Sequence, residues 1–350
     1  MLTTTILHGD CRDILPTLAA ERFDCCVTSP PYWGLRDYGV SGQIGLEPTM
    51  AAYLETMVGV CREMRRVLKP SGTFWLNIGD SYNAHPGQRK TTDKVGPKQL
   101  TNGGSNSAPS RHTPDLKPKD LCMIPNRLAI ALQDDGWWVR SEIIWAKPNP
   151  MPESVTDRPT SSHEKIWLLT KGERYFYDAA AIAEPVAVSS IDRLSQNIEA
   201  QAGSTRANGG AKTNGPMRAV INEGARKALR SITETRHRSS IPGGQSLQAE
   251  PTAFRNARNV WTVATQPFRG SHFATMPADL AERCIKAGCP AGGSVLDPFG
   301  GAGTTGLVAD RLGRNATLIE LNPEYADMAK RRIESDAGLF ADTTTDSGNG

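Results

Sequence analysis

An apolar run that ends in two prolines is the feature that most constrains the fold of this chain. Phe23-Asp24-Cys25-Cys26-Val27 leads directly into Thr28-Ser29-Pro30-Pro31-Tyr32-Trp33. The run predicts a buried strand, and the strand must end at the prolines because they cannot donate to a sheet ladder. Open α/β sheets bind their ligands at the carboxyl ends of their strands. The segment therefore predicts an α/β sheet with a polar and aromatic site at this strand's end.

The groups in this segment suit a planar ring that bears an amine. The Ser29 hydroxyl and a backbone carbonyl freed by the proline geometry can each accept one N–H. Tyr32 or Trp33 can stack on the face of the ring. The alternative is a Pro-Pro turn that merely ends a strand, but it explains neither the preceding serine nor the two aromatic residues that follow.

A glycine-rich turn far along the chain predicts a second ligand-binding loop. Val295-Leu296-Asp297 is typical of a short strand, Pro298 to Gly306 form the turn, and Leu307-Val308-Ala309 open a helix. Glycines let a backbone approach a ligand, and a helix N-terminus offers free N–H groups. Residues 316–321 predict another strand, and its Glu320 lies about twenty residues after the glycines, the spacing at which a carboxylate reaches ribose hydroxyls.

The glycine turn alone leaves a dinucleotide site open. Residues 301–306 match the Gly-x-Gly-x-x-Gly fingerprint of NAD-binding proteins, and no lysine follows to make a phosphate-binding Walker loop. An NAD site does not account for the Ser-Pro-Pro-Tyr segment.

Together the two motifs resemble those of the DNA amino-methyltransferases that use S-adenosylmethionine. Ser-Pro-Pro-Tyr resembles the family's catalytic motif, and Asp-Pro-Phe-Gly-Gly-Ala-Gly-Thr-Thr its cofactor motif. The catalytic motif comes first, which is the permuted order of the beta class. The resemblance covers residues 5–82, 121–178 and 260–334. It implies an α/β fold with a doubly wound, mostly parallel sheet of the Rossmann-like methyltransferase type and an inserted target-recognition region.

The resemblance also implies a set of site residues. The catalytic residues would be Ser29, Pro30, Pro31 and Tyr32. The cofactor would meet Asp10, His272, Phe273, Asp297, Phe299, Gly300, Gly301, Gly303, Thr304, Thr305 and Glu320. Among these, Glu320 would hold the ribose and Asp297 the amino-acid part, while a helix N-cap is an equally good interpretation of Asp10.

The resemblance implies methyl transfer to an amine of a base. The Ser29 hydroxyl and the Pro30 carbonyl would accept the two hydrogens of an exocyclic amine, whose nitrogen then attacks the methyl carbon in line. The nucleotide would be rotated out of the duplex and stacked on Tyr32. The chain has no Pro-Cys dipeptide, which carbon-5 cytosine methyltransferases need as nucleophile.

Cytosine N4 is the first choice of target, because adenine-N6 enzymes more often begin the catalytic motif with Asp or Asn. Adenine N6 is the alternative. An amine methyltransferase of RNA or protein is a more distant one, and a DNA-binding protein without enzymatic activity would leave the two motifs unexplained.

Positive charge is concentrated in two segments although the net charge is only +3. Residues 201–260 hold ten Lys/Arg against three acids, and residues 81–120 hold seven against three. Such segments are expected where a phosphate backbone lies, and solvated loops are the alternative. We expect duplex DNA as the partner, contacted by Trp33, Arg226, Lys227, Arg230, Arg236 and Arg238.

The resemblance, together with the charge pattern, implies four parts of the chain. Residues 1–178 would form the catalytic half, with a long basic loop at 83–118. Residues 179–258 would form the target-recognition region, 259–335 the cofactor-binding half and 336–350 a flexible tail.

Composition excludes several other classes. The chain has no stretch of eighteen apolar residues, so no membrane span is expected, and the N-terminus has no secretory signal pattern. The seven cysteines form no Cys-x-x-Cys pair, so we expect reduced thiols and no metal site. These features favour a cytoplasmic protein, and the resemblance implies a bacterial or phage-encoded enzyme that acts at the nucleoid. A homodimer and a separately encoded restriction nuclease are left open.

Overall fold

The computed structural model describes residues 2–84, 106–107, 113–186, 254–265, 276–337 and 343–347. The chain divides into two compact units, Met1–Ile182 with Arg258–Gly350, and Ala183–Ala257. The described residues of the second unit form an antiparallel ladder of β8 (Glu184–Pro185) and β9 (Phe254–Arg255). The five basic side chains predicted to bind DNA between Arg226 and Arg238 lie outside the described residues, as does most of the predicted loop 83–118.

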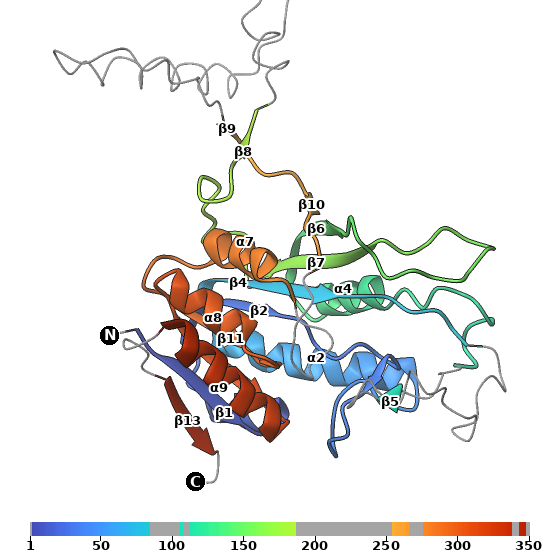
Figure 1. The fold of residues 1–350 in the computed structure, drawn as a ribbon, viewed down its shortest axis with the longest axis horizontal. Helices are drawn as coiled ribbons and strands as arrows, with labels where there is room; N and C mark the ends of the chain where they lie inside the picture. The colour runs from blue at the N-terminus through green and yellow to red at the C-terminus, as the bar shows by residue number, and fades with distance from the viewer. Residues whose placement is uncertain are drawn as a thin grey trace, which may run out of the picture. The chain divides into compact units, whose positions relative to one another are not determined.

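The first unit is built on one large sheet, which has nine strands among the described residues (Figure 1). Their order across the sheet is β10-β6-β7-β4-β2-β11-β12-β1-β13. Their bounds are β1 (Thr4–His8), β2 (Phe23–Thr28), β4 (Leu68–Ile78), β6 (Trp138–Ala146), β7 (His163–Thr170), β10 (Val260–Thr262), β11 (Ser294–Asp297), β12 (Asn315–Glu320) and β13 (Thr343–Ser347). Strand β7 runs antiparallel to β4 and β6, and every other pair is parallel. A separate short ladder joins β3 (Arg36–Asp37) to β5 (Asn106–Ser107).

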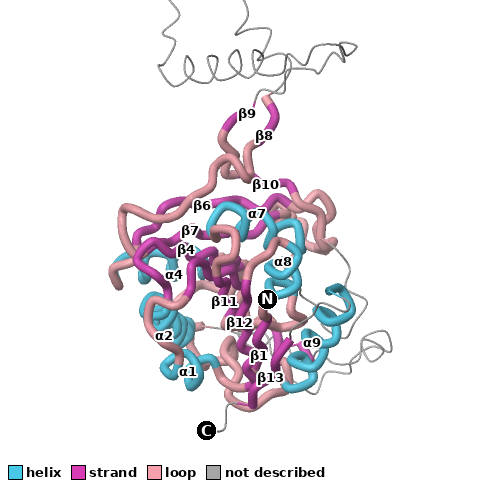
Figure 2. The backbone as a smooth tube through the Cα atoms, turned by 90° about the vertical axis from the view of Figure 1, so that its left-hand side faces the viewer, coloured by secondary structure: helices cyan, strands magenta, loops and turns pink. Residues whose placement is uncertain are grey.

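Helices cover both faces of this sheet (Figure 2). One face carries α1 (Cys11–Ile14), followed by the 3₁₀ turn η1 (Leu15–Thr17), α2 (Met50–Val67) and α4 (Ile124–Asp134). The other carries α7 (Ala278–Gly288), α8 (Thr304–Arg311) and α9 (Pro323–Ala337). The predicted doubly wound, mostly parallel sheet is therefore confirmed.

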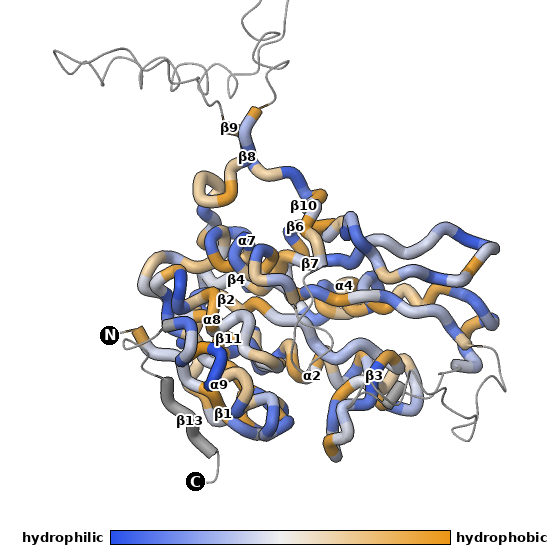
Figure 3. The backbone as a smooth tube through the Cα atoms, viewed as in Figure 1, coloured by the Kyte–Doolittle hydropathy of each residue, from blue (hydrophilic) through white to orange (hydrophobic). Residues whose placement is uncertain are grey.

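Helix α2 shows how the sequence produces these layers. It begins after Thr49, whose side chain accepts the Ala52 N–H at 3.1 Å as an N-cap. Its buried residues, Met50, Tyr53, Met57, Val60, Cys61, Met64 and Val67, recur at helical spacing and face the core. Hydrophobic colour likewise marks α4, whereas the loop between β6 and β7 is hydrophilic along most of its length (Figure 3). None of the helices in the described part of the chain is long and apolar enough to cross a membrane.

Strand β4 follows α2 directly at Leu68, and its register against β2 shifts between Phe23 and Cys25, which is a bulge in β4. Two features differ from the sequence-based expectation. Residues 336–350 were predicted to be a flexible tail, but Thr343–Ser347 form β13, which pairs in parallel with β1 at the edge of the sheet. Helix α8 begins at Thr304 rather than Leu307, because Gly303 takes a left-handed φ of 76° and forms the N-cap.

The strand order brings distant parts of the chain together. Strand β11, from the carboxyl-terminal half, lies between β2 and β12 and is parallel to both. Strand β1 follows on the far side of β12. The carboxyl ends of these four strands therefore meet at one edge of the sheet, and they lead into Ser29, Asp297, Glu320 and Asp10.

Candidate functional site

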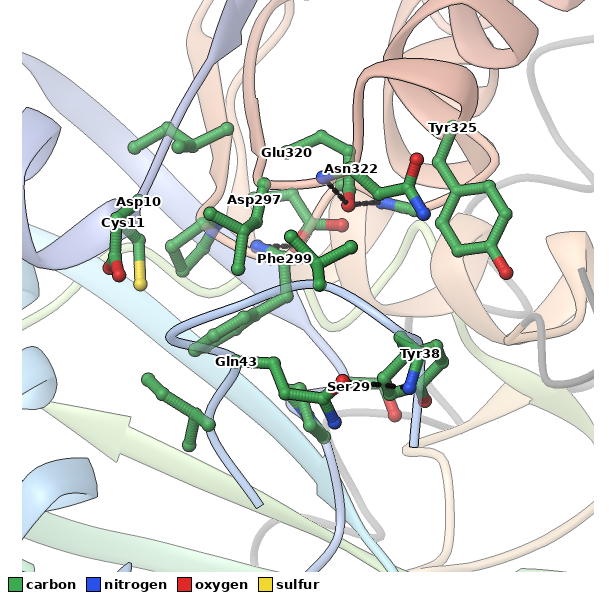
Figure 4. Close-up of a pocket in the computed structure, with 18 of the residues that line it drawn as sticks. Asp10, Cys11, Ser29, Tyr38, Gln43, Asp297, Phe299, Glu320, Asn322 and Tyr325 are labelled. Atoms are coloured by element: carbon green, nitrogen blue, oxygen red, sulfur yellow. Dashed lines mark hydrogen bonds between the residues drawn. The ribbon is translucent and has the colours of Figure 1, made fainter. Parts of the chain in front are cut away.

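A pocket lies at the carboxyl ends of β1, β2, β11 and β12 (Figure 4). Its space is about 940 Å³, including open solvent at its mouth. The predicted site residues in its wall are Asp10, Ser29, Pro31, Asp297, Phe299, Gly300, Gly301, Thr304, Thr305 and Glu320. The two sequence motifs thus share one cavity.

Asp297 joins the two motifs at the bottom of this site. Thr28, the residue before Ser29, donates its hydroxyl to Asp297 Oδ1 at 2.5 Å across 269 positions of sequence. Thr305 of α8 donates to Oδ2 at 2.7 Å, and the Phe299 N–H donates to Oδ1 at 3.0 Å. The residue is only 4% exposed, and burial raises the pKa of its carboxyl. Both oxygens are thus engaged by the protein, so Asp297 fixes the turn beside the strand end that precedes Ser29.

Glu320 holds the other side of the glycine turn. Its Oε2 accepts the Gly301 N–H at 2.7 Å, and its Oε1 accepts the Asn322 N–H at 2.8 Å. Burial, the largest cause, raises the pKa of this carboxyl above its ordinary value. The carboxylate lies in the pocket wall beside Asn322 (Figure 4). A carboxylate in this setting can accept ligand hydroxyls.

The glycines of the turn serve close packing. A Cβ on Gly303 would lie 2.8 Å from Ala329 Cβ of α9, and one on Gly300 would lie 3.0 Å from Leu318 Cβ of β12. Gly303 is not among the residues that line the pocket. The pocket therefore gives no support to its predicted cofactor contact. The close approach of α9 and the left-handed backbone explain why a glycine stands at this position.

Contacts with α2 and with Gly79 after β4 hold the Ser-Pro-Pro-Tyr segment in place. Tyr53 of α2 donates its hydroxyl to the Pro31 carbonyl at 2.9 Å. The Tyr32 ring packs so closely on Gly79 that a Cβ there would lie 2.6 Å from Tyr32 Cε2. Ser29 lines the pocket, and its Oγ lies 3.3 Å from the Tyr32 hydroxyl.

Trp33 does not offer the DNA-contacting surface expected of it. The side chain is 3% exposed and belongs to the hydrophobic core, and its Nε1–H donates to the Glu47 carbonyl at 3.1 Å. The sequence placed it beside a catalytic motif, but packing against α2 and its neighbours turns it inward.

Asp10 forms the helix N-cap that was one of its two expected roles, and its cofactor contact stays a prediction. It caps α1 by accepting the Arg12 N–H at 2.8 Å, and it also lines the pocket. Its ion pair with Arg12 measures 2.5 Å, and Arg12 in turn donates to the Gly42 carbonyl at 2.6 Å. Asp10 and Arg12 therefore fasten the loop that contains Gly42 to the pocket's edge.

Sequence reasoning missed part of the pocket wall. Tyr38, Val40, Gln43 and Ile44 line it from the loop after the catalytic motif, and Asn322 and Tyr325 line it after β12. The proximity of Asn322 to Glu320 in the sequence was an available signal, whereas the loop 34–45 has no readable pattern. His272 and Phe273 lie outside the described residues.

The cysteines do not contribute a nucleophile to this pocket. All seven are free and buried. Cys11 lines the pocket, but burial raises the pKa of its thiol to about 12. The thiol stays protonated at neutral pH and is a weak nucleophile.

Comparison with known proteins gives consistent results along almost the whole chain. The model of a DNA methylase family, the N6/N4 methyltransferases, matches residues 23–331. The type II methyltransferase M.SmaI of Serratia marcescens is 43% identical over 329 residues, which cover 94% of this chain and 90% of the relative. The type II methyltransferase M.Cfr9I of Citrobacter freundii is 40% identical over 333 residues, or 95% and 88% of the two chains.

Solved structures share the fold. The PvuII DNA methyltransferase, described as cytosine-N4-specific, gives a TM-score of 0.57 at 16% identity and covers 99% of this chain and 97% of its own. A candidate DNA modification methylase of Thermus thermophilus, TTHA0409, in complex with S-adenosyl-L-methionine, gives 0.54 at 20% identity, with coverage of 98% and 100%.

Proposed function

Because this chain belongs to the N6/N4 family of DNA methylases, we propose that it methylates the N4 amine of a flipped-out cytosine at a specific site in duplex DNA. Family membership makes it a DNA amino-methyltransferase with S-adenosylmethionine as its cofactor. The choice of cytosine rests on the serine that begins the catalytic motif. The observation that supports this reaction most directly is that Ser29 and the glycine turn line the same pocket.

The pocket suits S-adenosylmethionine. Glu320 is a half-buried acceptor for the ribose hydroxyls, and Phe299, Ile44 and Leu321 offer apolar surface for the adenine ring. The glycine turn between β11 and α8 packs tightly on its protein neighbours, because side chains on Gly300 and Gly303 would collide with Leu318 and Ala329. When bound, this cofactor supplies a methyl group on a positively charged sulfur, which an amine can attack.

The chain's own residues would orient the amine. The Ser29 hydroxyl oxygen can accept one of its hydrogens, and a proline carbonyl the other. The Pro31 carbonyl is already occupied by the Tyr53 hydroxyl, and no hydrogen bond to the Pro30 carbonyl is found within the described residues. Pro30 is therefore the carbonyl left for the amine. Holding both hydrogens directs the nitrogen lone pair, and such alignment is a major source of rate.

Cytosine N4 lies inside the duplex, so the base must leave the stack to reach Ser29. Unstacking costs a few kcal/mol. Tyr32, beside Ser29, is the proposed stacking face for the extruded ring, and the segment 179–258 is the proposed target-recognition region.

Nucleoside mass spectrometry of duplex DNA treated with the enzyme and S-adenosylmethionine tests the proposal. We expect N4-methylcytosine. Detection of N6-methyladenine alone would change the target base but not the class of reaction. Transfer to RNA or protein but not to DNA would overturn the proposed substrate. Methylation-aware sequencing of the same DNA identifies the site.

Ser29→Ala tests the site itself. We expect a reduction of about 100-fold or more in the single-turnover rate, the range for loss of a directly acting hydrogen-bonding group, with cofactor affinity preserved. An unchanged rate would remove Ser29 from the chemistry.

A further inference from the structure

A polar cluster that does not line the cofactor pocket surrounds the hydroxyl of Tyr32, the last residue of the catalytic motif. Its members are Tyr32, Asn77, Lys147 and Glu164, from the catalytic loop, β4, the end of β6 and β7. The Tyr32 hydroxyl lies 2.7 Å from Glu164 Oε2, and Asn77 Nδ2 lies 2.9 Å from the same oxygen. Lys147 forms an ion pair with Glu164 Oε1. Among the described residues, the only side-chain hydrogen bond from this cluster to a residue that lines the cavity is the 3.3 Å contact between the Tyr32 and Ser29 hydroxyls.

The chemistry of the carboxylate fixes the direction of every hydrogen bond in this cluster. An ionised Glu164 has no proton to give, so Lys147, Asn77 and Tyr32 must all donate to it. Tyr32 has a single hydroxyl hydrogen, and it donates this hydrogen to Glu164 in a hydrogen bond. Asn77 Nδ2, which also lies 2.9 Å from the Tyr32 hydroxyl, donates there as well. The Tyr32 oxygen can therefore only accept from its remaining neighbour.

That remaining neighbour is Ser29. Because Tyr32 can only accept, the hydrogen of the Ser29 hydroxyl points to Tyr32. The lone pairs of the Ser29 oxygen are then free for an N–H donor. If Tyr32 donated to Ser29 instead, the Ser29 hydrogen would be free to point at the amine. Ser29 would then present a donor, not an acceptor, to the N–H group.

The cluster is built to keep this direction. The Glu164 and Lys147 side chains are only 17% and 18% exposed, and the Lys147 ammonium lies 4.3 Å from the centroid of the Trp145 ring. Burial and, next, the charge of Glu164 raise the pKa of Tyr32 well above its ordinary value. The phenol therefore stays protonated at neutral pH and can donate to Glu164.

We infer that Glu164 is a positioning residue: through Tyr32 it directs the Ser29 hydroxyl hydrogen away from the target amine, so that Ser29 acts as an acceptor. This inference rests on the proposed function, since it assumes that Ser29 receives an amine, and it applies to either target base. Glu164 touches neither the base nor the cofactor in this arrangement.

Glu164→Gln is the direct test. The amide can turn its NH₂ group toward Tyr32, which allows the chain of hydrogen bonds to reverse. We expect the single-turnover rate of methyl transfer to fall about 10- to 100-fold. In metal sites, loss of a residue that orients a ligand through a hydrogen bond has an effect of about this size. S-adenosylmethionine affinity, measured by calorimetry, should stay within about 2-fold, because Glu164 does not line the cofactor pocket.

Glu142→Gln is the matched control. Glu142 lies on β6 and pairs with Lys165 at 2.5 Å, so the same substitution removes an ion pair from the adjoining strand without touching Tyr32. We expect its transfer rate to stay within about 2-fold of the wild type.

A double-mutant cycle with Tyr32→Phe separates positioning from a structural role. Phe keeps the ring on Gly79 but breaks the only path from Glu164 to Ser29 among the described residues, so Tyr32→Phe should slow transfer by itself and Glu164→Gln should add less than about 2-fold to it. Undiminished slowing by Glu164→Gln in the Tyr32→Phe background would overturn the inference. So would a wild-type rate for Tyr32→Phe, whether or not Glu164→Gln folds. A wild-type protein that methylates no DNA would instead refute the proposed function.

Discussion

Asp297 connects the catalytic and cofactor motifs through three hydrogen bonds, and this connection is testable at the scale of one residue. Asp297→Ala leaves Thr28, Thr305 and the Phe299 N–H without their buried acceptor. Each net hydrogen bond is worth about 0.5–1.5 kcal/mol, so we expect the free energy of unfolding to fall by about 2–4 kcal/mol in urea denaturation. Asp297→Asn, which retains one acceptor oxygen, should cost less. Equal stability of the alanine variant and the wild type would contradict this role.

Glu320 gives a pH-dependent prediction. Burial raises the pKa of its carboxyl above 4.5, so protonation begins at a higher pH than in an exposed glutamate. Only the ionised form accepts ribose hydroxyls with both oxygens, so affinity for S-adenosylmethionine should fall as the pH is lowered through this raised pKa. Glu320→Gln does not titrate.

Calorimetry from about pH 8 down to about pH 5 checks this. The ratio of wild-type to Glu320→Gln affinity should be about 10-fold or more at neutral pH, since a hydrogen bond to a charged group is worth about 1.5–3 kcal/mol, and it should shrink toward acid pH. A ratio that stays constant over the range would remove Glu320 from ribose binding.

At the scale of elements, the end of β4 supports the catalytic loop. Gly79→Ala would place a Cβ 2.6 Å from Tyr32 Cε2, so the Tyr32 ring has to move and its hydroxyl leaves Glu164. We expect a loss of about 10-fold or more in transfer rate, with cofactor affinity unchanged. Gly59→Ala is the matched control within α2, because its Cβ would meet nothing within 4 Å.

Gly59→Ala should raise the free energy of unfolding by about 0.5–1 kcal/mol, since alanine is favoured over glycine inside a helix. Its transfer rate should equal that of the wild type. If both alanine variants slowed transfer equally, close packing on Tyr32 would not be the cause.

Individual elements could be predicted because their signals are local. The apolar run of β2 and the helical spacing of α2 are readable within a few residues of sequence. The order of the strands is set by long-range pairing, so no local signal predicted that β11 lies beside β2. The hydrogen bond between Thr28 and Asp297 has no sequence signal at all, because it joins positions 269 apart.

The same limit explains where the site differs from the sequence-based expectation. Trp33 looked like a surface aromatic because it follows a catalytic motif, yet burial is decided by what packs on it. Gly303 matched a cofactor fingerprint, but the approach of α9 accounts for it. The sequence assigned Glu164 no role of its own, since its role depends on three partners from separate elements.

At the scale of the whole molecule, the insertion between β8 and β9 is proposed to recognise DNA. Residues 187–253 contain nine Lys/Arg and five Asp/Glu, and the strands that flank them pair Pro185 with Phe254. An Asn-Gly turn suits a short hairpin connection, so it can join Val186 to Phe254 in place of the insertion. The described strands of the core sheet and the described residues that line the cofactor pocket all lie outside 187–253.

We expect this deletion variant to bind S-adenosylmethionine within about 2-fold of the wild type in calorimetry and to lose site-specific methylation. Its DNA affinity should fall, and it should depend less steeply on salt, because each lost phosphate contact reduces the slope of log K against log salt by about 0.9. Charge reversal at Arg226, Lys227 and Arg230 in the full chain should shift affinity and slope in the same direction without affecting the cofactor. If both variants kept wild-type DNA affinity, recognition would have to lie elsewhere, and the basic loop at 83–118 would be the next segment to exchange.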